Sequence, residues 1–145
     1  MTTVTVSGIF AFVLLLVCGY TDFRKRAVDL RFVLGMTLAS FVLRVITKDK
    51  ISNVIITYVT ILLGTLLFCR VTKGGFGEGD AYVLAALSIL LDGVTLIGSL
   101  LTGLILAAFT ETVLIIAGYR KISDSFAFIP FLFCGYILLL GMEYF

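Results

Sequence analysis

The sequence contains no histidine and no tryptophan, and it has a single proline among 145 residues. Without histidine, this chain cannot itself form a Ser-His-Asp or Cys-His catalytic site, or a metal site with imidazole ligands. Charged residues make up only 14%, and a formal charge of +2 is too small to indicate nucleic-acid binding. Carboxylates, hydroxyls and three thiols therefore remain as candidate chemical groups.

The thiols of Cys18, Cys69 and Cys134 lie far apart, each inside or at the end of an apolar run. No Cys-x-x-Cys pair occurs, so neither a zinc site nor a disulfide framework is indicated. We expect the three to pack within or against helices, and we expect no metal and no cofactor.

Apolar residues are abundant instead. They make up 61% of the chain, and the mean hydropathy is +1.19, whereas soluble domains are about half apolar and about a quarter charged. A helix needs about 20 apolar residues to cross a bilayer. Polar breaks divide the sequence into six apolar segments with no linker between domains, at about residues 4–20, 28–46, 51–69, 80–91, 94–118 and 126–142. We therefore predict an all-α bundle of six transmembrane helices in one domain, residues 1–145.

The fourth segment is the shortest. About a dozen residues, at about 1.5 Å each, fall short of about 30 Å of hydrocarbon. The segment also follows a glycine-rich stretch, residues 70–79. Irregular backbone at membrane depth is tolerated only against protein or a wet cavity. This place is accordingly a first candidate for a functional site.

Lysines and arginines predict the orientation, because cytoplasmic loops are enriched in them. With the N-terminus outside, the inner loops hold Arg24, Lys25, Arg26, Arg31, Arg70, Lys73, Arg120 and Lys121, and the outer loops hold Arg44, Lys48 and Lys50. We therefore predict a multi-pass protein of the cytoplasmic membrane with both termini outside.

Two carboxylates, Asp22 and Asp80, then fall at the same cytoplasmic depth. Two carboxyls about 3 Å apart cannot both ionise cheaply, so one can act as a base on water while the other donates a proton. The alternative for Asp80 is a purely structural role, as a cap at the start of the fourth helix.

The residues before Asp80 are Gly77-Glu78-Gly79. Glycines let backbone approach closely and leave amides free to point at a carboxylate or a bound peptide. The pattern of a phosphate-binding loop is missing. A mobile loop over residues 74–79 is the natural element for admitting a substrate.

Three segments carry a resemblance to a known family: residues 21–29, Gly77-Glu78-Gly79-Asp80, and residues 128–132 with the sequence Phe-Ile-Pro-Phe-Leu. With them the chain resembles the type IV prepilin peptidases, membrane aspartic proteases of the GxGD class. The resemblance implies that Asp22 and Asp80 are the catalytic pair on the cytoplasmic face. It also implies that the substrates are prepilin-like or preflagellin-like precursors, cleaved between a short basic leader and an apolar helix.

The chain departs from this family's pattern in three respects. Tyr82 stands where many members have a lysine, and Val28 precedes Asp29 where the first motif has a proline. The insertion with paired Cys-x-x-Cys motifs that accompanies methyltransferase activity is missing. We expect a peptidase without methyltransferase activity.

Secondary candidates are Asp29 and Glu111. Asp29 competes with Asp22 for the catalytic role, but we expect it to cap the second span. Glu111 is an ionisable group inside an apolar segment, which is a functional hypothesis by default. It would support the pair, line the substrate groove or bond with Arg120. Glu78 is expected to be solvated or to contact a basic leader.

The alternative function is a small membrane transporter or channel subunit, in which Asp22 and Asp80 bind cations or relay protons. Either function places the chain in a lipid bilayer. Only the peptidase would lose cleavage of a precursor when either aspartate is replaced.

Overall fold

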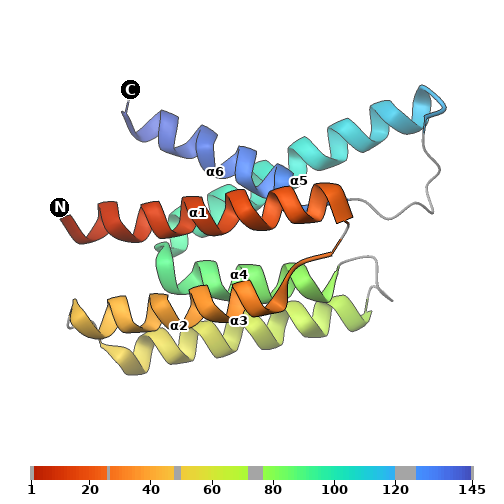
Figure 1. Cartoon of the computed structure of the whole chain (residues 1–145). Helices are drawn as coiled ribbons and strands as arrows, with labels where there is room; N and C mark the ends of the chain where they lie inside the picture. The colour runs from red at the N-terminus through yellow and green to blue at the C-terminus, as the bar shows by residue number, and fades with distance from the viewer. Residues whose placement is uncertain (1, 26, 48–49, 72–76, 120–126, 145) are drawn as a thin grey trace.

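The computed structural model describes residues 2–25, 27–47, 50–71, 77–119 and 127–144. These residues form six α-helices, which confirms the all-helical fold (Figure 1). The helices are α1 (Thr2–Lys25), α2 (Leu30–Ile46), α3 (Ile51–Val71), α4 (Glu78–Leu90), α5 (Gly93–Ile116) and α6 (Ile129–Tyr144).

Three of the described helices are long and apolar enough to cross a membrane, at Val6–Lys25, Ile51–Val71 and Gly93–Ile116. Helix α6 adds a shorter apolar stretch, Ile129–Met142. A span of about 20 residues matches the thickness of the hydrocarbon core, so these helices identify a membrane protein. The count of six spans and the direction of the termini stay predictions.

Helix α4 occupies the middle of the bundle. It packs against α1, α2 and α3, while α6 packs against α5 and α1. Figure 1 shows α1 running between α4 and α6, with the start of α1 and the end of α6 at the same end of the bundle. The helix with the fewest residues is thus the one with the most protein around it.

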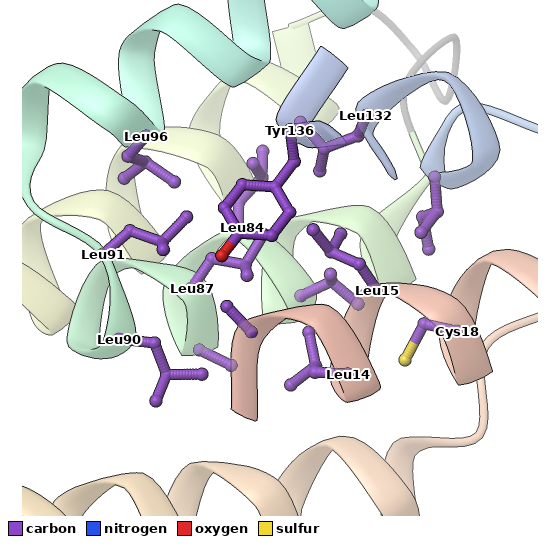
Figure 2. Packing of buried hydrophobic residues seen from close by; sticks show 14 of the residues in the cluster. Leu14, Leu15, Cys18, Leu84, Leu87, Leu90, Leu91, Leu96, Leu132 and Tyr136 are labelled. Atoms are coloured by element: carbon purple, nitrogen blue, oxygen red, sulfur yellow. The ribbon is translucent and has the colours of Figure 1, made fainter. Parts of the chain in front are cut away.

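The core lies where α1, α4 and α6 meet. Figure 2 shows Leu14 and Leu15 of α1 facing Leu84 and Leu87 of α4, with Tyr136 of α6 beside them. The Tyr136 side chain is fully buried, and its hydroxyl donates a hydrogen bond to the Gly8 carbonyl at 3.2 Å. A buried phenol needs such a partner, and this bond ties α6 to α1.

The C-terminal end of α4 also lies against protein. The Arg44 side chain of α2 donates from Nε to the Ile89 carbonyl at 2.7 Å, and from Nη2 to the Leu90 carbonyl at 3.4 Å. The last carbonyls of a helix have no partner within it, and a cation there also complements the helix dipole. Arg44 therefore allows α4 to stop inside the bundle.

Two helix boundaries differ from the sequence segments in a way that matters for the site. Helix α1 continues through Asp22 to Lys25, because Arg24 and Lys25 suit a helix C-terminus. Helix α4 begins at Glu78, so Asp80 is its third residue. The predicted start of the last segment, at residue 126, lies outside the described residues, and α6 begins at Ile129.

Candidate active site

Asp22 lies in the last turn of α1 with its side chain 7% exposed. Its Oδ2 atom accepts a hydrogen bond from the Ile129 backbone amide at 3.2 Å, and the Phe128 amide also donates to this carboxylate. Both donors belong to the start of α6, where backbone N–H groups have no partner inside the helix. A carboxylate is the natural ligand of such amides.

Asp80 lies in the first turn of α4 and is 9% exposed. The Gly77 amide donates to its carboxylate, and the Asp80 amide donates to the Gly77 carbonyl at 3.1 Å. This is half of a capping box, with Gly77 as the N-cap and the acidic side chain at the third helical position. The sequence left open that Asp80 is a helix cap. Asp80 does help to cap α4, but from the third helical position, and the N-cap residue is Gly77.

The two carboxyls come together although 57 residues separate them in the chain. Helices α1 and α4 pack against each other, and Asp22 is the charged side chain that acts on the Asp80 carboxyl. Asp22, in the last turn of α1, thus accepts hydrogen bonds from the start of α6, and Asp80 accepts one at the start of its own helix, α4. Two buried carboxyls on helices that pack against each other suit acid–base chemistry.

Close contacts with neighbouring atoms explain why glycines occupy positions 77 and 79, just before Asp80. A Cβ atom added at Gly79 would lie 2.9 Å from the Val28 Cγ2 atom and 3.0 Å from its Cβ atom. At Gly77 the added atom would lie 3.3 Å from an oxygen of Asp80. The missing side chains let the connection between α1 and α2 press against the start of α4. Residues 72–76 lie outside the described residues, and they include the first part, 74–76, of the predicted mobile loop.

Glu78 and Asp29 are placed differently from the buried pair. Both side chains are exposed. Asp29 is the N-cap of α2, and its carboxylate accepts from the Arg31 amide at 3.0 Å. The predicted capping role of Asp29 is thereby confirmed. The role of Glu78 toward a basic leader stays a prediction.

Glu111 is partly buried near the C-terminal end of α5. Its predicted partner Arg120 lies outside the described residues. The supporting role proposed for Glu111 stays a prediction.

The sequence reasoning did not assign the backbone amides of Phe128 and Ile129 to the site. A usable signal was present, because Pro130 follows them directly and proline favours the first turn of a helix. Free amides were therefore to be expected just before it. In the part of the chain that the structure describes, no three His, Cys, Asp or Glu side chains gather as metal ligands would.

Residues 9–116 match the model of the type IV leader peptidase family. The matched part includes both Asp22 and Asp80 and ends before α6. No curated protein and no solved structure matches the chain. The family match covers well over half of the sequence and agrees with the motifs around both aspartates, so the chain belongs to the type IV leader peptidase family.

Proposed function

We propose that this protein is a membrane aspartic endopeptidase that removes the leader of type IV prepilin-like or preflagellin-like precursors. Asp22 and Asp80 are its catalytic residues, and no metal or cofactor takes part. The observation that carries the proposal is that both carboxyls are buried on helices that pack against each other, and each accepts hydrogen bonds from backbone amides at a helix start. Family membership supports peptide hydrolysis as the reaction.

The chemistry needs one carboxylate and one carboxylic acid. The carboxylate accepts a proton from water as the water oxygen bonds to the scissile carbonyl carbon, and the acid protonates the carbonyl oxygen. Proton transfer to the amide nitrogen then breaks the C–N bond, which releases the leader and a new N-terminal amine. Two neighbouring carboxyls supply this mixed state because they do not both ionise readily.

The substrate side of the site is proposed to be the segment Gly77-Glu78-Gly79. The Glu78 side chain is exposed within two residues of Asp80, where a carboxylate would attract a basic leader. Gly77 leaves the backbone accessible beside the Asp80 carboxyl. An apolar precursor helix would remain in the bilayer while its first residues reach the pair.

The proposed topology places the pair at the cytoplasmic face of the membrane, with six spans and both termini outside. Asp22 shares the last turn of α1 with Arg24 and Lys25, and Arg70 lies in the last turn of α3. Basic residues concentrate on the cytoplasmic side of membrane proteins. The start of α4 follows the end of α3 in the chain, so Asp80 belongs to this same side.

The test is cleavage of a co-expressed model prepilin in membranes, read as the size of the product. We expect Asp22→Asn and Asp80→Asn each to reduce cleavage at least about 1,000-fold, because either change removes one member of the acid–base pair. Asp29→Asn keeps an N-cap acceptor and is expected to cleave normally. Glu111→Gln is expected to retain most activity.

Cleavage that survives both Asp22→Asn and Asp80→Asn would refute the aspartic mechanism. If no variant affects processing but the aspartates control proton or cation flux in vesicles, the transporter alternative replaces the peptidase.

A further inference from the structure

The two carboxyls of the site are held by different parts of the chain. Asp80 accepts from Gly77, three residues before it, so its hydrogen bond forms whenever α4 does. Asp22 accepts from Ile129, 107 residues away, so its bond exists only when α6 is docked. The hydrogen bond to Asp80 thus comes from its own helix, whereas the hydrogen bond to Asp22 depends on the packing of α6 against α1.

The backbone amides at the start of α6 donate to Asp22. The Phe131 and Leu132 amides both donate to the Phe128 carbonyl, at 3.0 and 3.1 Å, and Pro130 has no N–H. The amides of Phe128 and Ile129 precede Pro130 at this helix start, and both donate to the Asp22 carboxylate. Pro130 prevents a further amide from competing at this place.

The position of α6 is itself fixed by close backbone contact with α5. A Cβ atom added at Gly135 would lie 2.6 Å from the Ser99 carbonyl oxygen, and one added at Gly103 would lie 2.9 Å from the Leu132 Cα atom. Small residues let two membrane helices approach to backbone contact. Such contact leaves little freedom for α6 to slide along α5, so the two amides stay aimed at Asp22.

We infer that the first turn of α6 makes the pair unequal: the amides of Phe128 and Ile129 hold Asp22 in its ionised form, as the general base, and leave Asp80 as the acid. Hydrogen bonds from backbone amides favour the charged form of a carboxyl, and Asp22 accepts from two amides whereas Asp80 accepts from one, that of Gly77. Phe128 and Ile129 are positioning residues in this scheme, because they act through Asp22. The inference rests on the proposed function, and it adds which aspartate has which role.

Two substitutions at Ile129 separate the effect of its backbone amide from the effect of its side chain. Ile129→Pro lacks the N–H, and proline fits the first position of a helix. Ile129→Ala keeps the N–H but loses most of the same fully buried side chain. The difference between these two variants reports the amide, and their thermal unfolding in detergent shows whether both remain folded.

The measurement is the pH dependence of kcat/KM for cleavage of a model prepilin. The base must be ionised, so we expect Ile129→Pro to move the acidic limb of the profile up by about one pH unit and to lower kcat about tenfold relative to Ile129→Ala. Ile129→Ala, which keeps the amide, supplies the reference profile for loss of the buried side chain. Superimposable profiles for the two variants, or a shift of the alkaline limb alone, would overturn the inference.

A second measurement, of the protonation of the two aspartates, requires neither a substrate nor a substitution in α6. Infrared spectra of the purified full chain at neutral pH detect the carbonyl band of a protonated carboxyl. We expect this band to weaken in Asp80→Asn relative to wild type, since Asp80 holds the proton. An unchanged band in Asp80→Asn, together with its loss in Asp22→Asn, would reverse the roles and refute the inference. Failure of the wild type to cleave any precursor would instead count against the proposed function.

Discussion

Helices α3 and α4 are neighbours in the chain, pack against each other and are both strongly apolar, yet their surroundings are opposite. Along the described part of α3, Cys69 is buried while side chains such as Leu63 and Leu67 are more than half exposed. Most residues of α4 are buried. Lipid and protein interior are similarly apolar, so hydropathy does not distinguish a helix that faces the bilayer from one enclosed by protein.

Residue size accounts for the difference. Helix α4 has fully buried alanines at positions 81, 85 and 86, and Gly79 in its first turn. Small side chains on several faces let α1, α2 and α3 approach at once. The polar groups at its ends, Asp80 and the carbonyls bonded by Arg44, are satisfied by protein. Enclosure by protein is what allows a helix too short to span the bilayer to carry a buried carboxyl.

The largest expected contrast comes from truncating one leucine in each helix. Leu87 of α4 is 1% exposed and Leu63 of α3 is 58% exposed. Leu87→Ala is expected to lower the free energy of unfolding by about 2–5 kcal/mol, through lost contacts and a cavity. Leu63→Ala is expected to change it by less than about 0.5 kcal/mol. Reversible unfolding in mixed detergent micelles measures both values, and equal losses would contradict the contrast between an enclosed α4 and an exposed α3.

A glycine in each helix gives the next contrast. Gly79→Ala places a Cβ atom against Val28, whereas an added Cβ atom at Gly64 of α3 meets nothing within 4 Å. We expect Gly79→Ala to cost about 1–3 kcal/mol and to impair prepilin cleavage, because the start of α4 must shift. Gly64→Ala is expected to be neutral or stabilising, by up to about 1 kcal/mol.

A second substitution tests the stated cause. Val28→Gly removes the two side-chain atoms that the new Cβ atom would approach most closely, so it is expected to restore cleavage to the Gly79→Ala variant. If the double variant is as impaired as Gly79→Ala, the contact with Val28 is not the reason for the glycine.

The features that the sequence predicted well are those decided locally. Long apolar runs identified the helices, because the bilayer sets their length. The cap at Asp29 followed from its place just before an apolar segment. The depth of Asp22 and Asp80 and the glycines before Asp80 singled out these two residues, and the structure buries both on helices that pack against each other; their catalytic role stays a prediction.

The features that escaped prediction depend on how distant segments dock. The donation from Ile129 to Asp22 joins residues 107 positions apart, and no local rule pairs them. The contact of Gly79 with Val28 likewise arises from tertiary packing. The continuation of α1 to Lys25 was missed because the charged residues indicated the end of an apolar run, although they are also good helix formers.

The smallest expected effect on stability comes from the turn between α4 and α5. Asp92 is the exposed N-cap of α5 and accepts from the Thr95 hydroxyl at 2.6 Å and from the Val94 and Thr95 amides at 3.1 Å. The Thr95 hydroxyl bond is the main cause that lowers the pKa of this carboxyl below its usual value. Asp92→Ala is expected to cost about 1 kcal/mol of stability at pH 7.

The sign of the pH dependence follows from the lowered pKa. The stabilisation from ionised Asp92 is complete above the unfolded value of about 3.9 and is lost as the pH falls through the folded value. Asp92→Asn retains an acceptor but cannot titrate. The stability of the wild type relative to Asp92→Asn should therefore decline between about pH 5 and pH 2 in detergent unfolding, and a constant difference over that range would contradict the role given to the charge.

The contact between Gly79 and Val28 also has a consequence for how sequences of this kind diverge. The two positions share one small volume at the edge of the site, and the described geometry has no room for side chains on both. An inherited increase in size at position 79 is tolerated only in a lineage where position 28 has become smaller. The two positions are therefore expected to covary among relatives. Such covariation would indicate selection for the packing that holds the start of α4, and with it Asp80, in place beside α1.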